Sequence, residues 1–296
     1  MKNTNIYRVF KSSAAVAATA LLLNCCDASA ASADALAGWK EQAISPVANP
    51  LFFESPLIQS EVRPVFVYHN ISDDFIGGFA RVYALQLRYA LTERLAVIAT
   101  KDGFIQLRPR VDGLRADGWA DIGAGLKYAL IDDKEHNFIL TPGLKYELPS
   151  GNRRVFQGNG DGEFNVFVSA MKGWDKVHAT ASVGGRIPVN FDDETSSLHY
   201  SLQLDYHLCQ WFIPFVVANG HTVLSEADGP AFEVEGFDLI NFGASKAGGF
   251  TQVAVGTGFR SRLCKWADFG FAYEKGVTRP KGLFEDRFTV DMILRF

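Results

Sequence analysis

Three residues between positions 199 and 205 are of the types that form a serine hydrolase triad. His199, Ser201 and Asp205 supply a base, a hydroxyl and a carboxylate, and a triad needs these groups within hydrogen-bonding distance of one another. All three occupy alternate positions of one segment, as residues on one face of a β-strand do. At about 3.4 Å per residue, His199 and Asp205 then lie roughly 20 Å apart. The spacing argues against catalysis, and we predict that the chain is not an enzyme.

A second candidate is the glycine-rich stretch Gly158-Asn159-Gly160-Asp161-Gly162. It does not join a strand to a helix, so it lacks the context of a dinucleotide-binding motif. Its oxygen-bearing residues do not have the spacing of a calcium loop, and the histidines are not clustered as metal ligands. We therefore predict a loop with tight turns, no metal and no cofactor.

A larger set of polar residues lies on one face of the alternating segments that follow residue 60. Both signs of charge are present and nearly cancel, and buried charges persist where they are paired or hydrated. Two roles stay open, namely salt bridges that brace a wall and a hydrated path with weak ion selectivity. The candidates for lining such a lumen are Arg88, Asp121, Lys127, Lys145, Glu147, Glu163, Arg186, His199, Asp205 and Asp291.

The elements that position these residues are strands. Between residues 198 and 208 the alternation is unbroken, with Leu or Tyr at every even position and polar residues between them. Similar patterns recur near residues 120–130, 138–147, 177–187 and 252–260. Too many long strands have a fully polar second face for a soluble sandwich, and no helices cover them. Closure into a barrel, with apolar faces toward lipid and polar faces toward a lumen, accounts for both faces.

The composition agrees with this fold class. The 296 residues are 48% hydrophobic and 21% charged, and no run reaches the roughly 18 apolar residues of a spanning helix. The formal charge of −4 provides no basic surface, so no nucleic-acid partner is predicted. The sequence predicts an all-β, transmembrane, antiparallel up-and-down β-barrel in contact with a lipid bilayer.

The number of strands follows from parity, because both ends of such a barrel should lie on the same side. Short connections (92–94, 132–137, 173–176, 209–210 and 262–265) alternate with long ones (103–118, 149–162, 190–197, 225–249 and 276–285). Short periplasmic turns and long outer loops are typical of these barrels, and the alternation indicates about twelve strands. Residues 237–244 would make a thirteenth, so we assign them to a long outer loop that could fold inward. Lys101-Asp102-Gly103 is predicted to be a bulge or strand end at the rim.

The N-terminal 60 residues are predicted to lie outside the barrel strands. Residues 1–30 have the basic, apolar and Ala-x-Ala regions of a secretory signal peptide, with a lipoprotein signal ending at Cys25 or Cys26 as the alternative. Residues 31–60 are interrupted by prolines and are predicted to be a periplasmic segment, lying either free or against or within the barrel mouth. The barrel then comprises residues 61–296.

Two cysteines, Cys209 and Cys264, fall in predicted neighbouring periplasmic turns. Export allows them to form a disulfide, although positions two strands apart are about 10 Å apart and a disulfide needs Cα atoms roughly 4.4–6.8 Å apart. A disulfide and two free thiols both stay open.

The last nine residues alternate and end on Phe296, and this strand resembles the closing strand of outer-membrane β-barrels, whose terminal aromatic is read by the assembly machinery. Together with 91–95 (LTERL), 125–128 (GLKY), 148–151 (LPSG) and 272–274 (AYE), it resembles the outer-membrane transporters grouped under the MetA pathway of phenol degradation. The resemblance implies a twelve-stranded barrel in the cell outer membrane that passes small, aromatic or hydrophobic solutes. We expect a passive channel, with a structural or adhesive barrel of blocked lumen as the alternative.

Overall fold

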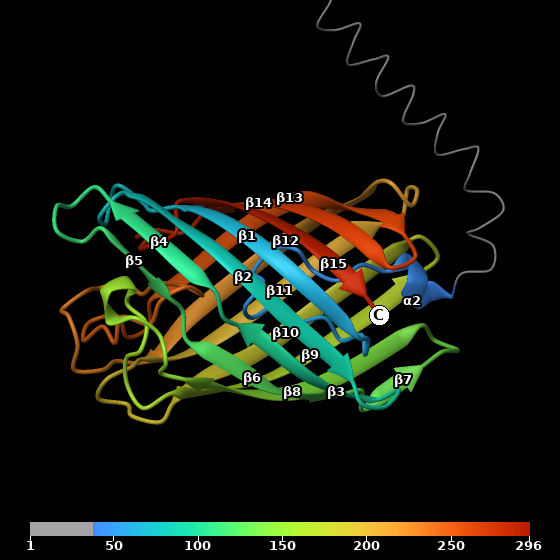
Figure 1. Ribbon diagram of the computed structural model, residues 1–296, viewed down its shortest axis with the longest axis horizontal. Helices are drawn as coiled ribbons and strands as arrows, with labels where there is room; N and C mark the ends of the chain where they lie inside the picture. Colours follow the sequence, from blue (N-terminus) through green and yellow to red (C-terminus); the bar gives the residue numbers. More distant parts are fainter. Residues whose placement is uncertain (1–37) are drawn as a thin grey trace, which may run out of the picture.

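A computed structural model describes residues 38–296, so the predicted signal peptide lies outside the described residues. Within these residues the chain forms one closed antiparallel sheet, with the short helix α2 before it (Figure 1). The elements are α2 (Trp39–Gln42), β1 (Glu61–Asn70), β2 (Gly78–Ala90), β3 (Leu95–Lys101), β4 (Phe104–Pro109), β5 (Ala116–Trp119), β6 (Ile122–Tyr128), β7 (Ile131–Asp133), β8 (Phe138–Leu148), η1 (Arg153–Val155), β9 (Glu163–Trp174), β10 (Val177–Pro188), β11 (Ser196–Tyr206), β12 (Ile213–Ser225), β13 (Thr251–Cys264), β14 (Ala267–Gly276) and β15 (Asp286–Arg295).

The sheet closes because β1 pairs with β15 on one side and with β2 on the other. Two crossings consist of several strands each. The third crossing consists of β3 and β4, which pair with successive parts of β2. The fourth crossing contains β5, which pairs with β4, and β6, which pairs with β3. With β7 as the end of that fourth crossing, the wall has twelve crossings, which confirms the predicted fold class.

The two ends of the barrel differ as expected. Short turns, α2 and the C-terminus lie at one end, and the long loops lie at the other (Figure 1). The predicted loop 103–118 is wrong in its extent, because β4 and β5 continue the wall and only residues 110–115 connect them. Alternation was weak there, since Gly103, Pro109 and Gly118 interrupt the pattern.

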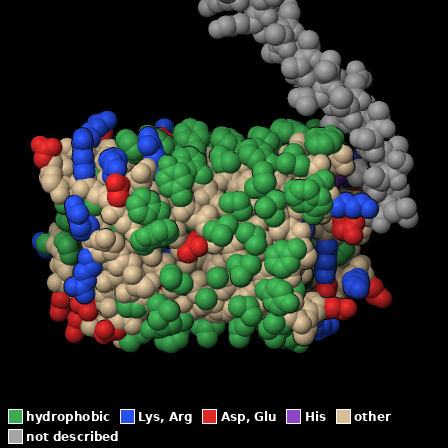
Figure 2. Space-filling view, in the orientation of Figure 1, with side chains coloured by type: hydrophobic (Ala, Val, Ile, Leu, Met, Phe, Trp, Pro, Cys, Tyr) green, Lys and Arg blue, Asp and Glu red, His purple; other side chains and the backbone are tan. Residues whose placement is uncertain are grey.

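The two faces of the strands follow the alternation. On β11, Leu202 and Leu204 are 50% and 45% exposed, whereas Gln203 between them is fully buried. The last strand behaves in the same way, with Phe288 and Phe296 outside and Asp291 inside. Figure 2 shows the resulting band of hydrophobic side chains, with charged groups concentrated at both ends. No helix within residues 38–296 is long and apolar enough to cross a membrane.

Candidate functional site in the barrel lumen

All ten candidate lumen residues point into the barrel. Nine of them are buried and Glu147 is half-buried. They do not form one site. They are distributed around the wall and contact two segments that fill the lumen from opposite ends.

The first segment is residues 43–57, which we call the N-terminal plug. All of it except the half-buried Leu51 is buried within the barrel. The expectation that this segment could fold into the barrel is confirmed for these residues, and its entry from the periplasmic side stays a prediction. Residues 43–60 contain one charged residue, Glu54. Burial of their apolar side chains and prolines is favourable, because it removes apolar surface from water.

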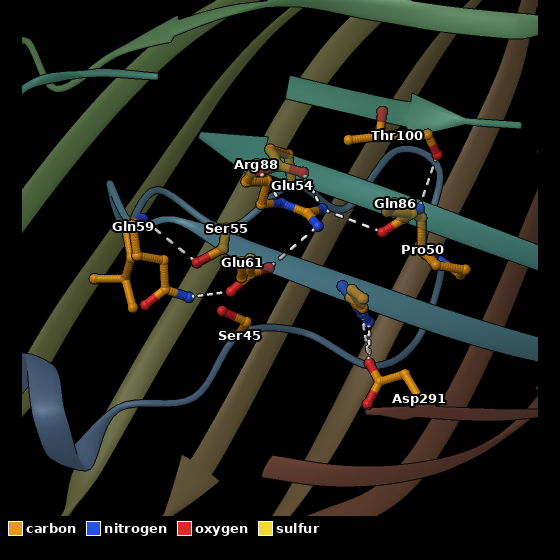
Figure 3. A network of polar contacts seen from close by, with 12 residues as sticks. Ser45, Pro50, Glu54, Ser55, Gln59, Glu61, Gln86, Arg88, Thr100 and Asp291 are labelled. Atoms are coloured by element: carbon orange, nitrogen blue, oxygen red, sulfur yellow. Dashed lines mark hydrogen bonds and ion pairs between the residues drawn. The ribbon is translucent and has the colours of Figure 1, made fainter. Parts of the chain in front are cut away.

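Glu54 is the main ionic contact of the plug. Its two carboxylate oxygens accept hydrogen bonds from Arg88 at 2.6 and 2.8 Å and from the Lys127 ammonium at 2.7 Å. Arg88 also lies 3.2 Å from Glu61 of β1, an arrangement seen in Figure 3. Burial alone would raise the pKa of Glu54, but the charges and hydrogen bonds of Arg88 and Lys127 outweigh it and hold the pKa below its usual range. The carboxylate is therefore ionised in the plugged barrel.

Backbone carbonyls of the plug accept further hydrogen bonds from wall side chains. The donors and acceptors are Arg260 to Ser45, Arg63 to Pro46, Gln86 to Pro50, Lys145 to Leu51 and Lys127 to Ser55. Figure 3 shows the plug crossing in front of the wall strands. No strand pairing joins residues 43–57 to the wall, so the hydrogen bonds between the plug and the wall are made by side chains.

Phe52 provides the aromatic contact between the plug and the wall. Its ring stacks on His199 with centroids 4.4 Å apart, and the cations of Lys145 and Arg186 lie 5.6 and 5.2 Å from its centroid. His199 otherwise contacts Asn165, while Asp205 pairs with His178 at 2.8 Å. The triad residues thus have separate partners, as their spacing predicted.

The remaining predicted residues brace the wall or its loops. Asp291 pairs with Arg63 and Arg260, and Glu163 pairs with Arg186 at 2.7 Å. Glu147 pairs with Lys101. Asp121 accepts hydrogen bonds from the backbone N–H groups of Gly151 and Gly158, holding the loop after β8 against the wall. No group of three or more potential metal ligands occurs within residues 38–296.

The second segment is residues 226–250, which we call the outer loop. It contains no strand, and residues 237–244 are buried within it, so the inward fold is confirmed. Glu235 accepts hydrogen bonds from the backbone N–H groups of Gly236, Phe242 and Ala244, fixing the turn. Asp238 pairs with Arg287 at 2.7 Å, and Gln157 donates to the Leu239 carbonyl.

Most contacts of the outer loop are nevertheless apolar. Its Val234, Leu239, Ile240 and Phe242 pack on inward aliphatic residues of the neighbouring wall, including Val67, Val82, Ile105 and Leu107. Phe242 also contacts the rings of Phe75, Phe156 and Phe232 at centroid distances of 5.4–5.7 Å. The part of the lumen where the outer loop meets β1, β2 and β4 is therefore apolar, while the ion pairs Asp238–Arg287 and Glu163–Arg186 lie at the same end of the barrel.

The lumen is closed in this arrangement. A vestibule of about 830 Å³ at the end near the C-terminus stops at Ala43 and Ser45 of the plug. Farther in, two cavities of about 20 and 30 Å³ lie between the plug and the wall. Each holds about one water molecule.

Sequence analysis missed Glu54 of the plug, Arg63 of the wall, which donates to the plug, and Arg287, which holds the outer loop. One signal was available, because Glu54 is a lone charge in an otherwise uncharged stretch of 18 residues, 43–60. The disulfide between Cys209 and Cys264, which the sequence left open, does not form, since Cys264 is a free, exposed thiol at the end of β13. Cys209 is buried whereas Cys264 is exposed, so the two side chains do not meet.

The predicted rim position of Lys101-Asp102 is also wrong. β2 pairs with β4 up to Tyr83 and with β3 from Leu87 onward, so the break lies halfway along β2. A register shift follows Ala99, consistent with the predicted bulge.

The fold and lumen define a membrane-spanning β-barrel of the outer-membrane class. Among solved structures, the COG4313 outer membrane channel from Pseudomonas putida F1 has a TM-score of 0.59 and 15% identity, covering 86% of this chain and 100% of its own. The NanC porin has a TM-score of 0.51 and 9% identity, with coverages of 80% and 100%. No family model and no curated protein match the sequence. These likenesses establish the fold.

Proposed function

We propose that the chain is an outer-membrane channel for the passive passage of small molecules, with its lumen closed in the present arrangement. The observation that carries the proposal is the way the N-terminal plug is attached. Wall side chains hold it, whereas the wall strands pair only with one another. The plug can therefore leave without breaking the barrel, exposing a lumen lined by both signs of charge that water can solvate.

The solutes that suit this barrel are small and largely apolar or aromatic. Aliphatic side chains and a cluster of phenylalanines pack where the outer loop meets the wall, and movement of the loop would expose them to a molecule entering from outside. Apolar lining with a few placed polar groups is typical of sites for small organic ligands. The sequence resemblance to transporters of the phenol-degradation group supports the same class of solute.

A structural or adhesive barrel is the alternative, supported by the filled lumen. Planar-bilayer recordings of the full chain and of a variant lacking residues 43–57 separate the two. We expect rare, small openings from the full chain and a persistent, larger conductance from the variant. A variant that folds, as judged by its heat-dependent gel mobility, but stays electrically silent would support the structural barrel instead.

We further propose that Phe296 is recognised by the outer-membrane assembly machinery. It is 70% exposed at the end of β15 and stacks on Tyr89, whereas Arg295 pairs with Asp268. Phe296→Asp should reduce the amount of folded barrel in outer membranes far more than Arg295→Asp. Equal amounts of the two variants would contradict this role.

A further inference from the structure

Two side chains of the N-terminal plug, Phe52 and Glu54, contact the wall differently from their neighbours. They lie two residues apart, and each is buried among polar or charged groups of the wall. Phe53 between them provides the contrast, since it packs with Ile213 and Phe215 in an apolar cluster. The plug thus presents one ring and one carboxylate to the polar part of the wall.

The Phe52 ring lies in a site formed by a histidine and two cations. It stacks on His199 with an angle of 21° between the ring planes, and the cations of Lys145 and Arg186 lie over it. A cation near the face of an aromatic ring is attracted by the ring quadrupole. The cavity of about 20 Å³ beside Phe52 and Lys145 leaves room for one small substituent on such a ring.

The Glu54 carboxylate lies in a site with more positive than negative charge. Arg88 and Lys127 donate to it, and Lys145 is the diagonal neighbour of Lys127 on the adjacent strand. Glu61 is the wall carboxylate that pairs with Arg88 (Figure 3). When the plug leaves, three cations therefore share one paired carboxylate. Confined charges need a partner, so the vacated site favours an anion.

The wall holds the ring site in place without help from the plug. Asn165 contacts the His199 ring at 2.8 Å, and Glu163 pairs with Arg186 at 2.7 Å. All four residues belong to neighbouring strands of the wall, β9, β10 and β11. A site that keeps its shape when empty binds at a lower ordering cost.

We infer that Phe52 and Glu54 occupy the binding site of the channel's solute, where they stand in for the ring and the carboxylate of a small aromatic acid. The inference rests on the proposed channel function. Residues two apart have Cα atoms at most about 7 Å apart, so a short alkyl chain between ring and carboxylate suits the site. Such an acid competes with the plug for the same contacts, and its binding favours the open form.

The test uses 3-phenylpropanoate, added to the full chain in planar bilayers at neutral pH. We expect an open probability at least tenfold higher than with equal concentrations of 3-phenylpropanamide, which lacks the charge, or propanoate, which lacks the ring. In the variant lacking residues 43–57, the same anion should instead lower the conductance at least twofold, because it occupies the site that the plug has left. Effects of opposite sign distinguish competition with the plug from a general effect on the bilayer.

Lys145→Gln tests the wall side of the site. Gln can still donate to the Leu51 carbonyl, as Lys145 does, but the charge beside the ring is lost. We expect a response to 3-phenylpropanoate that is at least fivefold weaker in both backgrounds. Lys172→Gln removes the same charge from the outward side of β9 and should respond as the unchanged chain does. If Lys145→Gln does not assemble, Lys127→Gln should weaken the block in the variant lacking residues 43–57.

Equal effects of 3-phenylpropanoate and its amide would overturn the site. An unchanged response in folded Lys145→Gln and Lys127→Gln would do the same. If conductance persists in the variant lacking residues 43–57, the channel proposal stands without the site. A silent bilayer from that variant would overturn the channel itself.

Discussion

The N-terminal plug and the outer loop fill the same lumen by different physical means. The plug is held by buried ion pairs and by hydrogen bonds to its backbone carbonyls, with Glu54 between Arg88 and Lys127 as its centre. The outer loop is held chiefly by apolar packing around Phe242 and Leu239, with Asp238–Arg287 as its ionic contact.

This difference indicates how each segment can move. Withdrawing the plug separates Glu54 from its buried cationic partners and leaves those charges without compensation. A partly withdrawn plug is therefore costly, and the plug should leave in one step. Apolar contacts are weak individually and lack direction, so the outer loop can shift by small steps while remaining packed. The plug therefore suits a barrier to ions and polar solutes, and the loop suits a lid over an apolar entrance.

Glu54→Gln should have the largest effect. It leaves Lys127 without its carboxylate partner in the plug and leaves Arg88 with Glu61 alone. Breaking a buried ion pair costs roughly 3–5 kcal/mol, and here that cost falls on the plugged form. We expect frequent large openings in planar bilayers. Glu41→Gln, on the exposed side of α2, is the control and should behave as the unchanged chain. Identical recordings from Glu54→Gln and the control would show that ion pairs do not hold the plug.

Phe242→Ala should loosen the outer loop, at a cost of about 3 kcal/mol for a buried ring. External protease should then cleave within residues 226–250, while the resting ion conductance stays low because the plug is intact. The control is Phe212→Ala, an exposed ring at the opposite end of the barrel. A large rise in conductance would mean that the loop, and not the plug, is the barrier to ions.

Glu194 should make closure of the outer loop depend on pH. It lies before β11, beside Thr195, whose backbone N–H donates to Asn241 of the loop. Burial, assisted by Glu163, raises its pKa from 4.5 to about 8, with Glu147 acting in the same direction and Arg186 and Lys101 opposing.

With the outer loop packed, Glu194 keeps its proton, whereas a hydrated Glu194 in the open form releases it. Closure of the loop is therefore fully favoured below pH 4.5 and weakens as the pH rises toward 8. The open probability should increase between pH 6 and pH 9. Glu194→Gln should flatten this profile, and an unchanged profile would assign the titration to another group.

Labelling of Cys264 is the smallest expected effect, and it tests which end of the barrel faces the periplasm. The thiol is free and exposed at the last residue of β13, at the end from which the plug enters. A membrane-impermeant maleimide should label it in cells with a permeabilised outer membrane and not in intact cells. Labelling of intact cells would place the plug at the outer side.

Sequence patterns predicted the wall well because strand alternation is local. The unbroken period of β11 and the Phe288–Phe296 pattern were sufficient to orient their side chains correctly. The wall around residues 101–121 was predicted less well, because Gly103, Pro109 and Gly118 interrupt the period along β4 and β5.

The sequence by itself determined the fold class, the number of crossings and which side chains face inward, since each of these depends on residues adjacent in the chain. Only the tertiary structure decided what fills the lumen and where the wall is broken. Glu54 meets Arg88 and Lys127, and Ala84 meets Asp102 and Ala120, only after the sheet has closed. Contacts across a barrel depend on register and on the path of the chain through the interior, and no local pattern of residues encodes either.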